Sequence, residues 1–115
     1  MDKSQWVEIP TDVWESPQEI IIIIPLGGVE KSSLKVALKN QIITVEGVRK
    51  KPKIGEKFKP ILQECFWWPF FKQITLPLNV YFDKIVVQLS PDNVLKIIVP
   101  KIDIPNEKEL DIQFI

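Results

Sequence analysis

The residue types that most enzymes use for acid–base or metal chemistry are nearly absent from this sequence. Its 115 residues include no histidine and one cysteine, Cys65. The chain therefore lacks the commonest general base and metal ligand, which excludes structural zinc and catalysis by a serine–histidine or cysteine–histidine pair. Gly27-Gly28 is a lone glycine pair rather than a phosphate-binding loop. The acidic residues stand mostly beside lysines in polar, turn-like stretches, which favours solvated surface over a catalytic carboxylate pair. We expect no catalytic residue, no metal, no cofactor and no enzymatic activity.

Charge and hydropathy also limit the partners. Lys plus Arg and Asp plus Glu number 15 each, so the formal net charge is zero. Nucleic-acid-binding proteins normally carry a basic excess, whereas a neutral chain has little self-repulsion and associates readily with itself. The longest apolar run, residues 20–24, is far shorter than the ~20 residues that span a bilayer. A lone cysteine cannot form an internal disulfide. We therefore expect a cytoplasmic protein that binds neither nucleic acid nor membrane.

The elements that must position the remaining side chains are short β-strands. Ten prolines interrupt the chain, and a proline inside a helix costs ~3 kcal/mol. The segments between them are rich in isoleucine, valine, phenylalanine and tryptophan, which favour strands. Short β-rich runs separated by turn signals are typical of a β-sandwich or barrel. The expected strands are residues 12–15, 19–25, 34–39, 42–49, 70–76, 84–89 and 94–100.

Four stretches, taken together and in order, resemble the alpha-crystallin domain of small heat-shock proteins. They are Leu26-Gly27-Gly28-Val29 with Leu34-Lys35-Val36, Ile43-Thr44-Val45-Glu46-Gly47-Val48-Arg49, Phe70-x-Lys72-x-Ile74-x-Leu76-Pro77, and Asp92-Asn93-Val94-Leu95 with Val99-Pro100-Lys101. The resemblance implies an all-β, immunoglobulin-like sandwich of two sheets. It also implies an ATP-independent chaperone (holdase) that binds partly unfolded client proteins and assembles into a homodimer or small homo-oligomer.

The resemblance divides the chain into three parts and shows three departures from the family pattern. Residues 1–11 are a short N-terminal arm, residues 12–101 the domain, and residues 102–115 a C-terminal extension. Gly27 stands where the family has proline and Asn93 where it has glycine, and both tolerate turn geometry. Lys72 replaces an arginine at a position of interface charge, so the charge is kept but the planar, two-pronged donor is lost.

The C-terminal extension carries the expected docking motif. Ile112 and Phe114 lie two residues apart, so on an extended segment they point the same way and can enter a groove as paired apolar side chains. Residues 102–104 have the same pattern but lie too close to the last strand. The groove implied by the resemblance lies between two strands and is formed by Leu34, Val36, Leu38, Ile85, Val87 and Leu89.

Residues 50–69 match in length the region that bacterial and plant members exchange between partners to form a dimer. Phe58, Ile61 and Leu62 are its expected apolar contacts. In the aromatic run that follows, alternation places Phe66, Trp68 and Phe70 on the core side. Trp67 and Phe71 then face outward, where we expect a partner or client surface.

Two alternatives stay open. The chain could be a CS-type co-chaperone of an ATP-dependent chaperone, or a structural sandwich that assembles through its isoleucine and tryptophan surfaces. A monomer in solution favours the co-chaperone, and an open-ended polymer favours the structural protein. Because only about ten residues precede the first expected strand, we expect a dimer or small oligomer with weaker holding activity than a longer relative.

Overall fold

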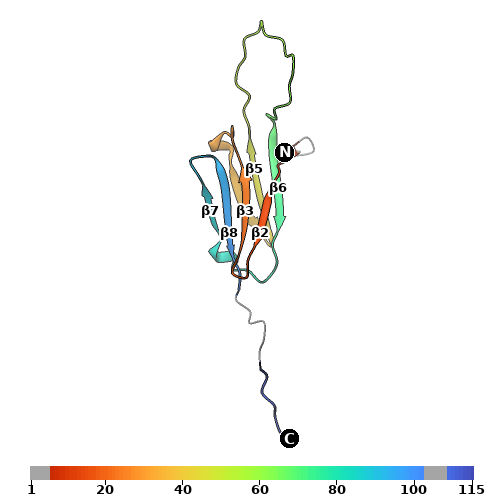
Figure 1. Ribbon diagram of the computed structural model, residues 1–115, viewed down its shortest axis with the longest axis vertical. Helices are drawn as coiled ribbons and strands as arrows, with labels where there is room; N and C mark the ends of the chain where they lie inside the picture. The colour runs from red at the N-terminus through yellow and green to blue at the C-terminus, as the bar shows by residue number, and fades with distance from the viewer. Residues whose placement is uncertain (1–5, 103–108) are drawn as a thin grey trace.

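The computed structural model describes residues 6–102 and 109–115 and shows two β-sheets packed face to face (Figure 1). Within the described residues each sheet has four strands, and two single 3₁₀ turns, η1 (Lys31–Ser33) and η2 (Phe82–Lys84), lie outside the sheets. In spatial order, sheet A contains β1 (Val7–Glu8), β6 (Pro69–Thr75), β5 (Ile42–Val48) and β4 (Lys35–Lys39). Sheet B contains β2 (Asp12–Glu15), β3 (Glu19–Pro25), β8 (Val94–Pro100) and β7 (Val86–Leu89). The all-β, two-sheet sandwich predicted from the sequence is confirmed.

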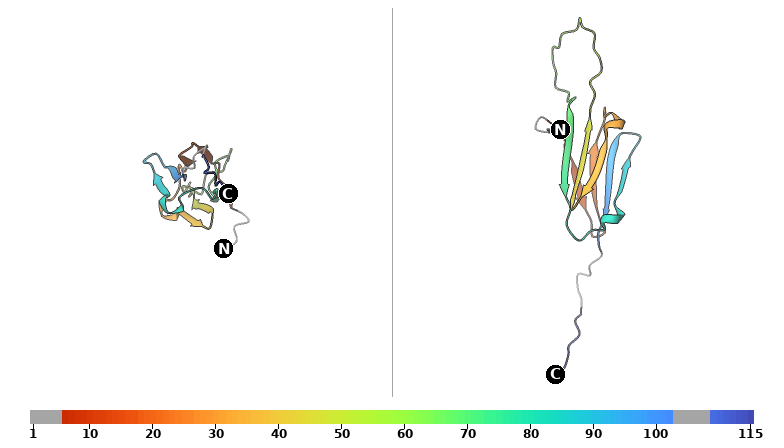
Figure 2. Two further views of the ribbon diagram at one scale, coloured as in Figure 1. Left: turned by 90° about the horizontal axis from the view of Figure 1, so that it is seen from below. Right: turned by 180° about the vertical axis from the view of Figure 1, so that it is seen from behind.

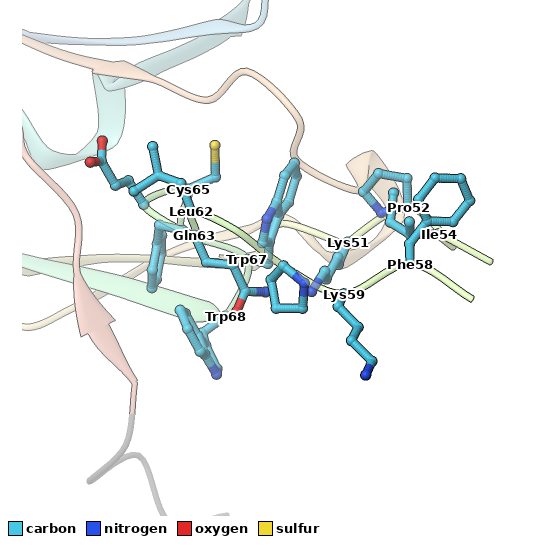
Figure 3. A pocket seen from close by; sticks show the side chains of 13 residues that line it. Lys51, Pro52, Ile54, Phe58, Lys59, Leu62, Gln63, Cys65, Trp67 and Trp68 are labelled. Atoms are coloured by element: carbon cyan, nitrogen blue, oxygen red, sulfur yellow. The ribbon is translucent and has the colours of Figure 1, made fainter. Parts of the chain in front are cut away.

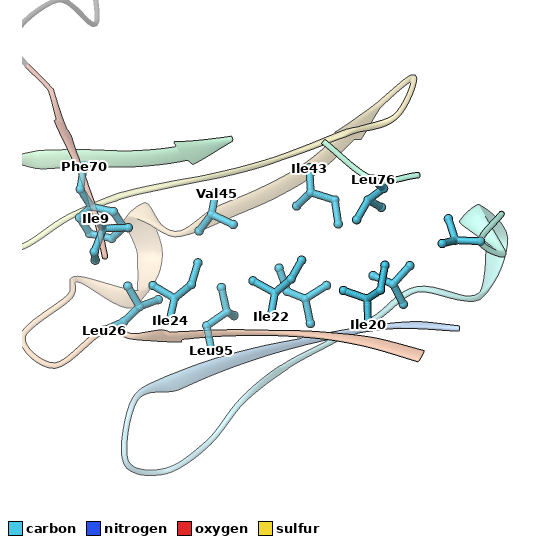
Figure 4. Packing of buried hydrophobic residues seen from close by; sticks show 13 residues of the cluster. Ile9, Ile20, Ile22, Ile24, Leu26, Ile43, Val45, Phe70, Leu76 and Leu95 are labelled. Carbon is cyan, nitrogen blue, oxygen red and sulfur yellow. The ribbon is translucent and has the colours of Figure 1, made fainter. Parts of the chain in front are cut away.

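The core forms where the inward-facing residues of the two sheets meet. Ile20, Ile22 and Ile24 of β3 are buried, and the residues between them face outward. Sheet A supplies Ile43 and Val45 of β5, and Phe70 of β6, to the opposite side of the same layer (Figure 4). The period of two in the isoleucine run therefore fixes which face of β3 points to the core.

Turn residues lie where the strands reverse. Asn93, between β7 and β8, has a φ of 62°, and Asn40, between β4 and β5, has a φ of 56°. Asparagine tolerates this left-handed backbone better than most residues, because its short polar side chain bonds locally. The predicted turn at Asn93 is confirmed. Gly28 has a φ of 78° and ends the tight turn that follows β3.

One strand was not predicted. Val7–Glu8, assigned to the N-terminal arm, forms β1 and pairs in parallel with β6. The next residue, Ile9, is 3% exposed, and its N–H donates to the carbonyl oxygen of Phe71 at 3.1 Å. Ile9 thus belongs to the core at the side of the sandwich where the chain crosses from β1 to β2. Two residues carry no recognisable strand signal of their own, so only this pairing reveals the element.

The predicted alternation of the aromatic run is wrong at one residue. Trp68 was placed on the core side with Phe70, yet it is 59% exposed. The regular alternation requires an extended strand, and β6 begins only at Pro69. The residues before Pro69 belong to the long loop, where backbone direction no longer follows the period of two.

The molecule is much longer than a compact domain. Its Cα radius of gyration is 20.3 Å and its longest dimension is 89 Å, whereas a compact chain of this length has a radius near ~13 Å. The loop between β5 and β6 projects from one end of the sandwich, and residues 109–115 lie beyond the other (Figures 1 and 2). Both extensions leave apolar side chains in solvent.

Candidate functional site

The predicted groove lies at one lateral side of the sandwich, where β4 and β7 are the edge strands of their sheets. Val36 and Leu38 are paired with the buried residues Val45 and Ile43, so they face inward. Their counterparts on β7, Val87 and Leu89, are paired with the buried Ile97 and Leu95. The structure therefore brings four of the six predicted residues to the inner surfaces of two edge strands.

These inward-facing residues are incompletely covered. Leu38 is 41% exposed and Val87 46% exposed, although each faces the inside of the sandwich. Leu34 and Ile85, which lie just before β4 and β7, are half-buried against the core. At the opposite lateral side Ile9 fills the corresponding position and is buried. The sandwich is thus closed by its own chain on one side and open to an apolar occupant on the other.

The apolar side chains of the C-terminal segment, residues 109–115, are exposed and do not pack in the core. Ile112 is 75% exposed and Phe114 92% exposed, and residues 109–115 form no strand or helix of their own. Leu110 precedes Ile112 by two residues and is also exposed. The alternative motif at residues 102–104 lies partly outside the described residues, although Ile102 itself donates its N–H to the carbonyl oxygen of Asn79 at 2.9 Å.

The loop of residues 49–68 joins β5 to β6 without forming a regular element. Loops longer than about 12–15 residues without secondary structure are uncommon in compact domains and are often functional. Its predicted contact residues, Phe58, Ile61 and Leu62, are all strongly exposed. Residues from both limbs of the loop line an open hollow of about 930 Å³ (Figure 3). The apolar side chains of Phe58, Ile61 and Leu62 therefore have little to pack against within one chain.

The base of the loop, by contrast, is fixed to the sandwich by Arg49, which the sequence did not single out. Its Nε donates to the carbonyl oxygen of Gly27 at 3.0 Å, and its Nη2 donates to that of Pro25 at 3.3 Å. The guanidinium also lies 5.9 Å from the ring centre of Phe66 and 6.0 Å from that of Phe70. Arg49 thus ties the start of the loop to the turn after β3.

The predicted outward aromatic surface is only partly present. Trp67 is half-buried and lies over the glycine turn: a Cβ added at Gly28 would stand 3.9 Å from its Cζ3. Phe71 is also half-buried. The more exposed aromatic is Trp68, whose ring centre lies 5.6 Å from that of Phe66. Trp68 is therefore the better candidate for a contact with another chain.

Lys72, predicted as an interface charge, has a partner in its own chain. Its Nζ donates to Oε1 of Glu8 at 2.6 Å, which links β6 to β1. The Lys72 side chain is 24% exposed, and that of Glu8 60% exposed. The lysine charge is thus already matched before any second subunit is considered.

Two classes of site are absent from the part of the chain that the structure describes. Among residues 6–102 and 109–115, no group of three His, Cys, Asp or Glu side chains is arranged to hold a metal ion. No helix within these residues is long and apolar enough to cross a membrane.

The structure is that of a β-sandwich protein with exposed apolar side chains at one lateral side and on two extensions, the long loop and the tail. The chain belongs to the Hsp20/alpha crystallin family, whose model matches residues 12–114. It is therefore a small heat-shock protein, a chaperone rather than an enzyme. The alternatives of a co-chaperone or a structural scaffold are not favoured by this match.

Individual proteins agree with this assignment. The chain is 29% identical over 110 residues to a 17.6 kDa class II heat shock protein of Arabidopsis thaliana, with 94% of this chain and 70% of that protein covered. Its fold is similar to that of a small heat-shock protein from Xylella fastidiosa (TM-score 0.74, 22% identity, 96% of this chain and 100% of that one). Heat shock protein 16.0 from Schizosaccharomyces pombe gives a TM-score of 0.74 at 21% identity, with 93% and 99% covered.

Proposed function

We propose that this small heat-shock protein is an ATP-independent holdase that binds partly unfolded polypeptides and assembles with itself through its tail and its long loop. The observation that carries the proposal is the coexistence of an uncovered inner face at β4 and β7 with exposed, alternating apolar residues in residues 109–115. The uncovered inner face needs an apolar occupant, and the exposed apolar side chains of residues 109–115 need a surface that buries them.

The tail fits the groove in spacing and in charge. Ile112 and Phe114 project to the same side when the segment is extended. Val36 and Leu38, which are also two residues apart, do the same on β4. Charges support the same pairing: Glu109 and Asp111 are acidic, whereas β4 carries Lys35 and Lys39 and η2 ends at Lys84. Residues 109–115 lie beyond the far end of the sandwich (Figure 1), and Ile112 and Phe114 are exposed there, so the proposed occupant of the groove is the tail of a second subunit.

The loop supplies the second contact. In the single chain its apolar residues Phe58, Ile61 and Leu62 are exposed, and burying such side chains contributes about 1.5–3 kcal/mol each. Exchange of identical loops between two subunits buries both copies at once and gives a two-fold dimer. β2 offers the matching site, because in the described residues it pairs only with β3 and its other edge is open.

The partners that follow are other copies of this chain and unfolding client proteins. We also propose a cytoplasmic location, which the single exposed Cys65 supports, because proteins of oxidising compartments more often pair their cysteines.

Suppression of client aggregation tests the holdase proposal. We expect the full chain to slow the light-scattering rise of reduced insulin B chain in the absence of ATP. A chain with Ile112→Ser and Phe114→Ser loses its larger assemblies but keeps the sandwich intact. Gln113→Ser is the matched control, because Gln113 points to the other side of the extended segment. If the full chain does not reduce aggregation even at a large molar excess, the holdase proposal is wrong.

A further inference from the structure

The outer face of sheet B carries an apolar row that runs across all of its strands. Trp14 of β2 is paired with Ile21 of β3, Ile21 with Ile98 of β8, and Ile98 with Val86 of β7. Directly paired residues share one face of a sheet. Their chain neighbours Ile20, Ile22, Ile97 and Val99 are buried in the core, so the four paired residues point to solvent. We call these four residues the sheet B stripe.

The stripe is exposed, and the outer face of sheet A has no equivalent row among its described strands. Trp14 is 63% exposed and Val86 46% exposed, while Ile21 and Ile98 are half-buried between them. On the outer face of sheet A, one row joins Ala37, Thr44 and Gln73, and another joins Lys35, Glu46 and the half-buried Phe71. Sheet B thus presents an unbroken apolar row on its outer face, beside a row that contains Asp12, Ile23, Lys96 and Gln88. An exposed apolar patch on a sheet face is a candidate contact surface.

The size of the stripe argues against a stable contact between two such faces. Four strands at about 4.8 Å spacing, with one row of side chains and its flanks, cover roughly 300 Å². Stable interfaces bury about 800 Å² on each partner. A second copy stacked on the stripe would therefore cover less than half of the necessary area. A short apolar segment of an unfolded chain, bound weakly and released, fits this area better.

The proposed assembly also leaves this face free. The exchanged loop uses the open edge of β2, and the tail uses the groove between β4 and β7. Both contacts lie at the sides of sheet B, whereas the stripe lies on its flat outer surface. An occupant of the stripe must then come from outside the assembly.

We propose that the sheet B stripe is a client-binding surface, which takes extended apolar segments of unfolding polypeptides. This inference rests on the holdase function proposed above and assigns that function to Trp14, Ile21, Ile98 and Val86. An apolar row on the face of a sheet selects for hydrophobicity rather than for sequence, as a chaperone of varied clients requires.

Neighbouring valines of β7 allow a sharp test. Val86 and Val87 have equal exposure, 46% each, but point to opposite faces of the strand. The variant Trp14→Thr with Val86→Thr replaces the two most exposed residues of the stripe. The variant Leu38→Thr with Val87→Thr makes the same kind of change in the groove. Gln88→Thr on the outer face is the neutral control. Aggregation of reduced insulin B chain, mass in solution and thermal unfolding are measured for each variant.

The stripe variant should need about tenfold more protein for half-suppression of aggregation, with unchanged mass and unfolding temperature. The groove variant should instead lose assembly mass. Unchanged suppression by the stripe variant, beside an active full chain, overturns this inference alone. A fall in mass for the stripe variant assigns the stripe to contact between copies and also overturns it. A full chain that binds no insulin B chain overturns both the inference and the holdase function.

Discussion

Gly47 shows at the scale of one residue how tightly the core constrains the family motif that contains it. It lies in β5, is paired with Phe70 of β6 and faces the buried layer. A Cβ added at Gly47 would stand 2.9 Å from the Cζ atom of the Phe70 ring and 3.4 Å from Val29. Phe70 is fully buried in the core cluster, so its ring can move away only by displacing other core residues. The glycine is needed for the close packing of this aromatic ring.

We therefore expect Gly47→Ala to lower the free energy of unfolding by about 1–3 kcal/mol, the usual cost of overpacking a core. Gly27→Ala is the matched control, because no atom lies within 4 Å of a Cβ added there and the backbone is not left-handed. It should change stability by less than about 0.5 kcal/mol. Urea unfolding of both variants checks this difference, and equal effects would contradict the packing explanation.

At the scale of elements, β1 is held to β6 by its backbone, by the buried Ile9 and by the ion pair between Lys72 and Glu8. Glu8 is largely exposed, and exposed ion pairs contribute about 0–1 kcal/mol. The position and burial of Ile9 therefore matter more for closing this side of the sandwich than the charges do.

A double-mutant cycle of Glu8→Gln and Lys72→Gln should give a coupling energy below about 1 kcal/mol. Lys72→Gln alone should leave the mass in solution unchanged, because the lysine is paired within its own chain. The mass in solution of the Lys72→Gln variant also tests the interface role that the sequence predicts for Lys72. A lower mass for this variant would show that the charge acts between subunits.

The sequence predicted the fold well where residues alternate over a whole strand. The bounds of β3 and β8 follow from proline and turn residues at their ends, and the turn asparagine at Asn93 follows from its local conformational preference. It could not predict β1, because a two-residue strand is defined only by its pairing with β6. It also misplaced Trp68, since the side on which a loop residue lies depends on tertiary contacts such as those of Arg49.

The candidate site was predictable in part, because alternation along a strand shows which residues share a face. The inward direction of Val36, Leu38, Val87 and Leu89 follows from the period of two. Their incomplete burial does not, because it depends on which strands end up at the sheet edges. The stripe on sheet B likewise requires the register of four strands, which brings together residues from distant parts of the chain.

At the scale of the whole molecule, the proposed assembly uses the two extensions at opposite ends of one sandwich as two separate contacts between subunits. The loop would join subunits as pairs, and the tail would join one pair to another. Each contact should therefore be removable without the other, and the sandwich should stay folded in both cases because the residues to be changed in each extension are exposed.

The most direct test of this account is the mass in solution, measured by light scattering at several concentrations. Three chains are compared: the full chain, one with Ile112→Ser and Phe114→Ser, and one with Phe58→Ser, Ile61→Ser and Leu62→Ser. We expect an assembly of a dimer or larger for the full chain. We expect no species above a dimer for the tail variant, and loss of the dimer for the loop variant. A full chain that is monomeric at all concentrations would contradict both contacts together.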